Sequence, residues 1–324
     1  MKILVTGGAG FIGSHLIDSL LQQGHEVVNV DNFDGFYSRS QKEENLKGHF
    51  SYSNYHFLEG DVTDHDFLEK AFSLSAFDQV VHLAAKAGVR PSIEDPEKYE
   101  AVNVGGTIRL LEHARKNKVP KFILASSSSV YGSNPSVPWR ESDRDLQPIS
   151  PYAASKIAAE NYGRVYSVLY DIHFIALRFF TVYGPRQRPD LAIHKFFRSI
   201  YEGRPIPFFG DGSSRRDYTF IDDVIKGVMK AIMRERKGQS FEVYNLGNSS
   251  PVTLAELVKM IEDIAGKKAI LERLPGQAGD VERTFADIEM AEKELGYSPS
   301  VSLPDGLARF NEWIIELNNK KIRS

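Results

Sequence analysis

Near the start of the chain stands Thr6-Gly7-Gly8-Ala9-Gly10-Phe11-Ile12-Gly13, between an apolar run at 3–5 and a helical pattern. Gly7, Gly10 and Gly13 have the spacing that lets a strand turn tightly into a helix. Gly10 then lets phosphates approach the backbone N–H groups at the helix N-terminus, and Gly13 lets helix and strand lie close. The segment predicts a dinucleotide pyrophosphate site at the start of a βαβ unit.

An acidic residue strengthens this prediction. Asp31 ends the second apolar run, where a carboxylate accepts hydrogen bonds from an adenosine ribose and repels the 2′-phosphate of NADP, which favours NAD as the cofactor. The nearest basic residue after it is Arg39. The alternative is a strand-ending turn with an ordinary surface aspartate. Asp61 and Val62 follow the third run and are expected to hold the adenine, although a plain turn aspartate explains them nearly as well.

Six short apolar runs alternate with helical patterns up to about residue 180, which is typical of parallel βαβ units. The runs lie at 3–5, 26–30, 55–58, 79–83, 121–125 and 174–178. Ile12, Leu16 and Leu20 recur at steps of four, as in a helix packed on a sheet. We therefore predict an α/β fold with a doubly wound parallel sheet of the Rossmann type and a smaller C-terminal α/β substrate-binding domain.

The last third of the sequence differs from the rest in composition. Loops rich in Gly, Pro, Arg and Asp occupy 184–190, 203–217 and 272–284. Thr253 and Glu256 form a capping box before a helical stripe, and Gly266 stands where a C-terminal cap belongs. We expect residues 1–180, with a returning segment near 219–250, to form an NAD-binding domain. Residues 181–324 are expected to form most of the substrate-binding domain.

Composition excludes several classes of protein. The 324 residues carry 40 Lys plus Arg and 43 Asp plus Glu, a net charge of −3, without a long run of one sign. Nucleic acid is therefore not an expected partner. The chain has no cysteine, which removes disulfides, thiolate nucleophiles and cysteine metal sites, and no metal is expected. No apolar stretch reaches the roughly 18 residues of a membrane span, and we expect a soluble cytoplasmic protein.

Tyr152 is the one tyrosine of 14 that has a lysine four residues later, Lys156, in a helical pattern. The two side chains then share a helix face. A tyrosine of pKa about 10 is a useful base near neutral pH only when its phenolate is stabilised by roughly 4 kcal/mol. Lys156 and a cationic nicotinamide are candidates for that charge. On spacing alone, an exposed Tyr and Lys on a surface helix is the more probable interpretation.

Serines 126–129 directly follow the fifth apolar run. They are expected at the carboxyl end of a strand, where open α/β sheets bind ligands. Ser127 and Ser129 alternate onto one side. A polar loop that caps the strand explains the same residues about as well.

In their order along the chain, these motifs resemble the extended short-chain dehydrogenase/reductase family, and its nucleotide-sugar epimerase branch in particular. The resemblance rests on the glycine loop, the two aspartates, His82-Leu83-Ala84-Ala85, Asn103, the serine run and Tyr-x-x-x-Lys. It implies tightly held NAD, Tyr152 as base, Lys156 as its electrostatic partner and ribose ligand, and Ser127 or Ser129 as hydrogen-bond partner of the reacting hydroxyl. The implied cofactor contacts are Gly7, Gly10, Phe11, Ile12, Gly13, Asp31, Asn32, Asp61, Val62, Leu83, Ala84, Ala85, Asn103, Tyr152 and Lys156.

The segment 178–190 is similar to the loop that binds sugar and diphosphate in UDP-sugar 4-epimerases. Thr181 stands where UDP-galactose 4-epimerases usually have asparagine. Together with Ala87-Gly88-Val89-Arg90, the segment resembles UDP-glucuronate 4-epimerases, which implies that Thr181 and Arg188 hold the sugar carboxylate. A bidentate arginine suits a carboxylate physically. The alternatives are that Arg186, Arg188 and Asp190 form a surface ion-pair loop, or that the arginines bind only diphosphate.

The same resemblance assigns the remaining substrate contacts. It implies that Arg216 grips the UDP β-phosphate, that Phe209 packs on uracil, that Asp280 holds the nucleotide ribose and that Arg90 contacts substrate. Gln277 departs from the arginine common in galactose epimerases and leaves one diphosphate contact unassigned. Ser128 and Ser129 stand where sugar 4,6-dehydratases carry an acid and a base, and UDP-glucuronate decarboxylases carry glutamate at the position of Ser129. Elimination and decarboxylation are therefore disfavoured.

These features predict NAD-dependent 4-epimerisation of a UDP-sugar, with UDP-glucuronate converted to UDP-galacturonate through a bound 4-keto sugar that rotates before re-reduction. The alternatives are a UDP-glucose or UDP-N-acetylglucosamine 4-epimerase and, in another class, an NAD-binding sensor or scaffold without turnover. Intact Tyr152, Lys156 and serines argue against the last. The resemblance also implies a homodimer formed through helices at 98–117 and 153–170.

Overall fold

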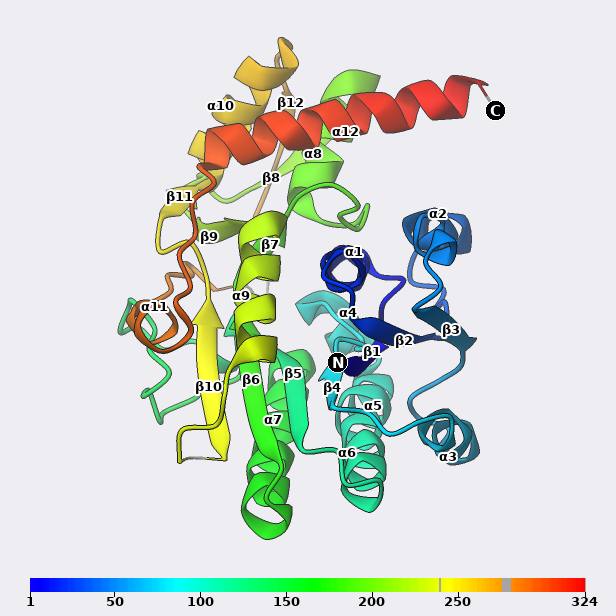
Figure 1. Ribbon diagram of the computed structural model, residues 1–324. Helices are drawn as coiled ribbons and strands as arrows, with labels where there is room; N and C mark the ends of the chain where they lie inside the picture. Colours follow the sequence, from blue (N-terminus) through cyan, green and yellow to red (C-terminus); the bar gives the residue numbers. More distant parts are fainter. Residues whose placement is uncertain (239, 276–280, 324) are drawn as a thin grey trace.

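The structure, a computed structural model, describes residues 1–238, 240–275 and 281–323, with side chains up to 319. Within these residues, seven parallel strands form the main sheet in the order β10-β6-β5-β4-β1-β2-β3 (Figure 1). Its strands are β1 (Lys2–Thr6), β2 (Glu26–Asp31), β3 (Tyr55–Glu59), β4 (Gln79–His82), β5 (Lys121–Ser127), β6 (His173–Phe179) and β10 (Phe241–Leu246). The six predicted runs are confirmed as strands, and the Rossmann-type sheet is confirmed.

Alternate residues along each strand bury on opposite faces, so the sheet is covered on both sides. Ile3 and Val5 of β1 belong to one apolar cluster, whereas Leu4 belongs to the other. The first cluster packs under α1 (Phe11–Gln22) and α9 (Ile221–Met233). The second packs under α3 (His65–Ser73), α6 (Thr107–Lys116) and α7 (Pro151–Tyr170). The predicted stripe of α1 is confirmed in Leu16 and Leu20, which are fully buried.

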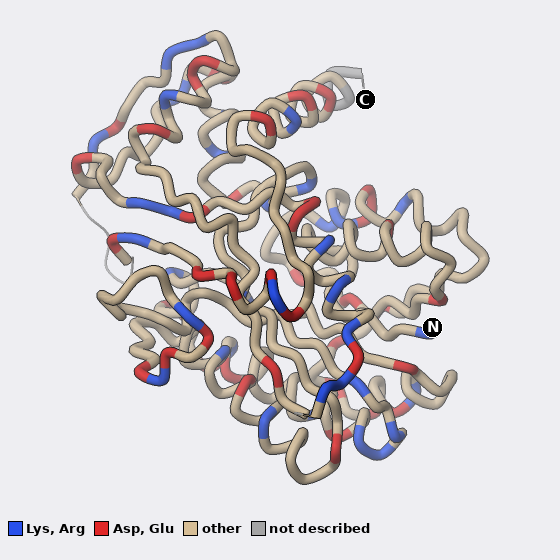
Figure 2. The backbone as a smooth tube through the Cα atoms, turned by 60° about the vertical axis from the view of Figure 1, so that its left-hand side comes forward, with Lys and Arg blue, Asp and Glu red and all other residues tan. Residues whose placement is uncertain are grey.

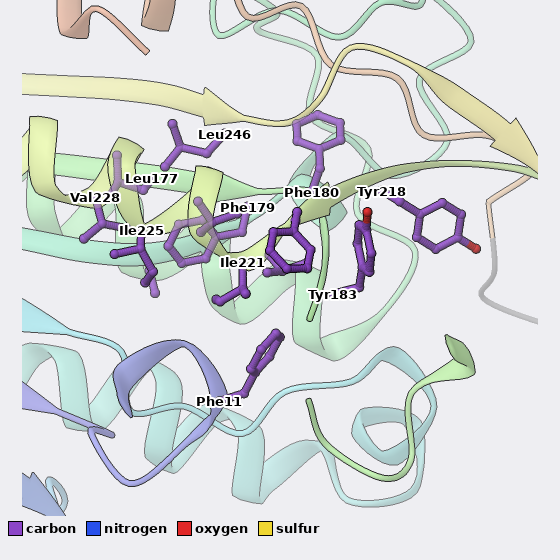
Figure 3. Packing of buried hydrophobic residues seen from close by; sticks show 14 of the residues in the cluster. Phe11, Leu177, Phe179, Phe180, Tyr183, Tyr218, Ile221, Ile225, Val228 and Leu246 are labelled. Atoms are coloured by element: carbon purple, nitrogen blue, oxygen red, sulfur yellow. The ribbon is translucent and has the colours of Figure 1, made fainter. Parts of the chain in front are cut away.

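The packing of α9 brings a late segment of the chain back onto the sheet (Figure 3). Ile225 and Val228 lie near Leu177 of β6, Ile221 lies near Phe179, and Phe11 at the start of α1 faces Ile221. β10 then pairs in parallel with β6 from Phe241 to Leu246. Residues 221–246 are thereby part of the large sheet layer although they follow the substrate loops in sequence.

The remaining segments form a smaller α/β layer above β10 in Figure 1. β7 (Thr181–Tyr183), β9 (Arg215–Phe220) and β11 (Pro251–Thr253) form one small sheet, and β8 (Pro205–Phe209) pairs with β12 (Ile270–Leu274). The helices of this part are α8 (Ala192–Glu202), α10 (Leu254–Ala265) and α12 (Leu303–Arg323), whereas α11 (Glu289–Leu295) lies beside β10 and packs on β10 and α9. The predicted capping box of α10 is confirmed, and Gly266 ends that helix with φ +65°.

Short helices and turns complete the large layer. They are α2 (Arg39–Leu46), α4 (Val89–Glu94), α5 (Pro96–Tyr99), a π-helical turn (Glu100–Gly106) and single 3₁₀ turns at His49–Ser51 and Ser128–Tyr131. Acidic and basic residues are interspersed along the chain (Figure 2). Among the described residues, no helix is long and apolar enough to span a membrane.

A buried histidine ties the sheet to the helix layer. His82 lies between the hydroxyls of Thr6, at 2.7 Å, and Thr107, at 3.2 Å. Burial, with a smaller effect of the Lys156 charge, lowers the pKa of His82 to about 3. The neutral ring is therefore the form that the fold holds, and protonation opposes folding.

We predict that this histidine weakens the protein in acid. Below pH about 6.5 the unfolded chain binds a proton at His82 that the folded chain does not, so the free energy of unfolding falls by about 1.4 kcal/mol per pH unit from this group until pH about 3. His82→Asn removes that dependence while keeping an amide for the threonines. Urea unfolding from pH about 7 to 4 measures it, and equal pH slopes for both proteins contradict the assignment.

Candidate active site

The strand order reverses between β1 and β4, and a cavity of about 430 Å³ opens at the carboxyl ends of these strands. Such a reversal is where open α/β sheets bind ligands. The segments that follow β1, β2, β3, β4, β5 and β6 all contribute residues to its lining. Of the predicted site residues, those that line the cavity are Gly7, Gly10, Phe11, Ile12, Gly13, Asp31, Asn32, Asp61, Val62, Leu83, Ala84, Ala85, Ser127, Tyr152, Lys156, Thr181 and Arg188.

The glycine loop is shaped by close backbone contacts. Gly7 has φ +76° and donates its N–H to Val30 O at 2.7 Å. A Cβ at Gly13 would lie 2.3 Å from Gly7 O, so the helix and the loop touch where a side chain would be. Gly10 is the N-cap of α1, with no side chain to bond the N–H groups of the first turn. Those N–H groups are left to bind a ligand anion.

Asp31 and Asp61, the two aspartates expected to bind the adenosine, are fixed by hydrogen bonds from backbone and side-chain groups. Asp31 accepts hydrogen bonds from Ala9 N at 3.0 Å and Phe33 N at 2.9 Å, and burial raises its pKa. Asp61 accepts from Asn32 Nδ2 at 2.7 Å and from the N–H and hydroxyl of Thr63. Although burial alone would raise the pKa of Asp61, these hydrogen bonds lower it. Arg39 pairs with Glu43 and Glu59 outside the cavity lining.

Sequence reasoning missed a group that lines the cavity after Asp31 and Ala85: Asp34, Phe36, Tyr37, Lys42 and Lys86. Lys86 Nζ lies 2.5 Å from Asp34 Oδ2, and Lys42 Nζ donates to Asp34 O at 2.8 Å. The signal was available in part, because the loop after a strand that ends on a ribose-binding aspartate lies at the ligand edge of the sheet. What the sequence could not show is that the β2 and β4 loops join through an ion pair.

These residues fit a dinucleotide. The cradle at Gly10 is open on the cavity side, since a Cβ there would meet only Gly7 O. The hydroxyl of Tyr37 lines the same cavity and is buried without a hydrogen-bond partner among the described residues, which is the condition of a group that awaits a polar ligand. The Asp31 carboxylate retains lone pairs for ribose hydroxyls.

The candidate catalytic pair lies beneath this cradle. Lys156 Nζ donates to Ala125 O at 2.7 Å and lies 5.9 Å from the centre of the Tyr152 ring, so both side chains share one face of α7. Burial lowers the pKa of Lys156 to about 8, an effect that the Glu160 carboxylate opposes. Burial raises the pKa of Tyr152, although the Ser127 hydroxyl and the Arg188 charge act in the other direction. The net effect of these surroundings is to disfavour the phenolate of Tyr152.

A buried network of hydrogen bonds and an ion pair lies one helical turn from Lys156. Glu160, one turn after Lys156 on α7, pairs with Arg178 of β6 through two hydrogen bonds of 3.0 and 2.7 Å. Ser126 also donates to Glu160 Oε1 at 2.5 Å. Because both ions of the pair are buried and multiply hydrogen-bonded, the pair holds α7 against β5 and β6 in one register.

Two predicted residues lie behind the cavity lining. Asn103 bonds both backbone groups of Lys86, at 2.8 and 2.9 Å, and reaches Ser155 Oγ, so it clamps the β4 loop to α7. Ser129 donates its N–H to Ser127 Oγ at 3.1 Å, and the two hydroxyls are also 3.1 Å apart. Of these two serines, Ser127 lines the cavity and Ser129 does not.

The predicted substrate residues divide into two groups. Thr181 and Arg188 line the cavity, whereas Arg90 and Phe209 lie outside its lining and contact each other, with the guanidinium 5.3 Å from the ring centre. Arg216 Nη1 donates to the carbonyls of Arg215 and Glu282. Asp280, like Gln277, lies outside the described residues. Direct substrate contact by these residues stays a prediction.

Arg188 already has a carboxylate partner, Asp190, at 2.7 Å. The ion-pair alternative for this loop is therefore realised in part, and Arg186 likewise pairs with Asp18 of α1. The two arginines differ in position, since Arg188 lines the cavity and Arg186 does not.

The fold and the site define a Rossmann-type dinucleotide-binding protein of the Tyr-x-x-x-Lys kind. Residues 3–247 match the model of the NAD dependent epimerase/dehydratase family, and the chain belongs to this family. It is 41% identical over 328 residues to UDP-glucuronate 4-epimerase 5 of Arabidopsis thaliana, covering 97% of this chain and 75% of that protein.

Solved structures agree with the sequence comparison. The UDP-glucuronic acid 4-epimerase of Bacillus cereus, in complex with UDP-glucuronic acid and NAD, superposes with a TM-score of 0.90 at 40% identity over 98% of this chain and 100% of that one. The UDP-glucose 4-epimerase of Thermotoga maritima, with UDP-glucose, gives 0.89 at 35% identity over the same shares. NAD is the cofactor of this family.

The glycine cradle generates a matched pair of predictions. Gly10 has φ −74°, which any residue adopts, and a Cβ there would meet only Gly7 O, at 3.2 Å, so Gly10→Ala should lower the melting temperature only slightly. It should weaken NAD binding about tenfold or more, because Gly10 lines the cavity at the helix N-terminus. Gly13→Ala should lower the melting temperature more, because its Cβ meets backbone. Calorimetric titration with NAD and thermal unfolding of the stripped proteins measure both. Undiminished NAD affinity of Gly10→Ala would refute the placement of the phosphates.

Proposed function

We propose that this protein is an NAD-dependent UDP-sugar 4-epimerase and that it converts UDP-glucuronate to UDP-galacturonate. The observation that carries the proposal is that one cavity is lined both by Tyr152, Lys156 and Ser127 and by Thr181 and Arg188. The first group suits oxidation of a hydroxyl, and the second suits a carboxylate on the same small ligand.

In the proposed reaction, the side chains of the protein transfer one proton between the sugar and Tyr152. Tyr152, as the phenolate, takes the proton of the sugar 4-hydroxyl, and Ser127 holds that hydroxyl by a hydrogen bond. NAD⁺, when bound, accepts the hydride from C4 and returns it to the opposite face of the sugar after the ring has turned. Lys156, fixed to Ala125 O at 2.7 Å, supplies a positive charge beside the phenolate and hydrogen bonds for the cofactor ribose.

The raised pKa of Tyr152 explains why cofactor and base act together. Burial disfavours the phenolate, and the positive charge of an oxidised nicotinamide offsets that effect. Tyr152 is then a base only while the cofactor is in the state that accepts hydride, and after transfer the phenol is ready to return its proton.

Arg188 and Thr181 have a second task when the sugar is a uronate. A 4-keto uronate is a β-keto acid, which loses CO₂ when the bond to the carboxylate aligns with the carbonyl π system. Thr181 and Arg188 hold the carboxylate away from that alignment, so they select the substrate and protect the intermediate.

UDP-glucose is a second candidate substrate, favoured by one observation. Arg188 is already neutralised by Asp190, so a neutral sugar does not leave an unpaired cation beside it. The similar Thermotoga maritima protein, a UDP-glucose 4-epimerase, supports the same option.

The organisation of the molecule follows from this proposal. Residues 1–180 with 219–250 serve as the NAD-binding domain, and residues 181–324 provide most of the UDP-sugar site. An exposed apolar strip on α7, made by Tyr162, Val165, Val168 and Leu169, is the surface for a homodimer together with the helical segment 98–117. We place the enzyme in the cytoplasm, with the lack of cysteine in the whole sequence as support.

Proton NMR of the sugar anomeric signals tests the proposed function. The protein is incubated separately with UDP-glucuronate, UDP-glucose and UDP-N-acetylglucosamine. We expect UDP-galacturonate to form fastest, and Tyr152→Phe to lower that rate about a hundredfold or more, because the proton acceptor is lost. Tyr52→Phe, an exposed tyrosine outside the cavity lining, serves as the matched control. Conversion of the neutral sugars alone contradicts the uronate assignment, and no conversion in any tube contradicts the enzyme assignment.

A further inference from the structure

The pair between Arg188 and Asp190 is built into one tight turn. Leu191 N donates to Arg188 O at 3.2 Å, and Pro189 occupies the second position of the turn. Proline restricts the backbone there. Arg188 Nε lies 3.0 Å from Asp190 Oδ1 and Nη2 lies 2.7 Å from Oδ2. The carboxylate therefore bonds one whole edge of the guanidinium.

The two members of the pair face different surroundings. Arg188 lines the cavity, whereas Asp190 is not among the lining residues. The side chain of Asp190 is 36% exposed and that of Arg188 is 18% exposed. Asp190 is thus the more exposed member of the pair and is not part of the cavity lining.

A second contact fixes the plane of the guanidinium. The ring of Phe36, from the loop after β2, lies 4.6 Å from Arg188 Cζ and also lines the cavity. Phe36 covers one face of the guanidinium and Asp190 binds its Nε–Nη2 edge, so neither contact covers the Nη1 end. Nη1 has no hydrogen-bond partner within the described parts of the chain, so this end is open to a ligand.

We propose that Asp190 is a positioning residue of the sugar-carboxylate site, which aims Nη1 of Arg188 into the cavity and thereby decides how much of the oxidised sugar is lost as CO₂. This inference rests on the proposed function. A guanidinium bound along one edge still offers its Nη1–Nη2 end to a second carboxylate in a bidentate fashion. An arginine freed from Asp190 samples other rotamers, and the substrate carboxylate then reaches the aligned geometry more often.

The step that competes with re-reduction is decarboxylation of the 4-keto sugar. In the 4-keto uronate the C5–C6 bond breaks, CO₂ leaves, and the electron pair of that bond forms the enolate of the C4 ketone. Water then protonates C5. The cofactor stays reduced until the C4 ketone of the resulting pentose takes the hydride back, so each escape yields one CO₂ and a UDP-pentose or its 4-keto form.

The test compares product partition among variants with UDP-glucuronate labelled with ¹³C at C6. The ratio of labelled CO₂ to UDP-galacturonate is measured for wild type, Asp190→Ala, Asp190→Asn, Arg188→Ala and Asp171→Asn. Asp171 pairs with Arg236 far from the cavity and is the matched control. Partition is a ratio within the active molecules, so a loss of folded protein does not change it, and UDP affinity measured in parallel reports whether each variant is folded.

We expect Asp190→Ala to raise the CO₂ ratio about threefold or more over wild type, in the same direction as Arg188→Ala. Asp190→Asn, which keeps one acceptor, should lie between Asp190→Ala and wild type, and Asp171→Asn should match wild type. If Arg188→Ala releases CO₂ and both Asp190 variants partition like wild type, the positioning role of Asp190 is wrong while the proposed function stands. If Arg188→Ala also partitions like wild type, or if wild type does not convert UDP-glucuronate, the carboxylate site itself is refuted.

Discussion

The site depends on one topological constraint, the reversal of strand order between β1 and β4. Crossovers that leave these two strands run in opposite directions, so no helix covers the gap at their carboxyl ends. The glycine loop after β1 and the Leu83-Ala84-Ala85 segment after β4 line that gap. Gly7 lies so near Ala84 that a Cβ would be 2.6 Å from its backbone N. The cofactor cradle and the path to Tyr152 therefore share walls that have no room for larger side chains.

Burial of charge is the second organising feature. Lys156, Glu160 and Arg178 are all buried, and each has a hydrogen-bonded partner. Their mutual attraction offsets the cost of taking them out of water only because α7 and β6 hold them in one geometry. The same burial raises the pKa of Tyr152 and lowers that of Lys156. Under the proposed function, a cationic cofactor in the same cavity would offset the effect of burial on Tyr152 and so link proton transfer to hydride transfer.

Local patterns were sufficient for the fold and for part of the site. The six strand runs are β-branched and apolar because both sheet faces are covered. The capping box at Thr253 predicts the start of α10, because its hydrogen bonds are local and need only Thr253 and Glu256 at this spacing. Tyr152 and Lys156 were found because a helix puts residues four apart on one face. What escaped prediction is formed by loops from different strands. Asp34 meets Lys86 across 52 positions, and Glu160 meets Arg178 from a helix to a strand. No periodicity in the sequence encodes such pairs. The contact of Asn103 with the backbone of Lys86 is likewise formed between distant segments and could not be predicted from a local pattern.

The central claim is that one nicotinamide removes and returns the same hydrogen at C4 of the sugar. UDP-glucuronate that carries deuterium at C4 tests this claim most directly, with the product analysed by NMR and mass spectrometry after turnover in ordinary water. Return of the same hydride predicts UDP-galacturonate that retains the deuterium at C4. Replacement of the deuterium by solvent hydrogen would contradict it, because the configuration would then be inverted by proton exchange and not by hydride transfer.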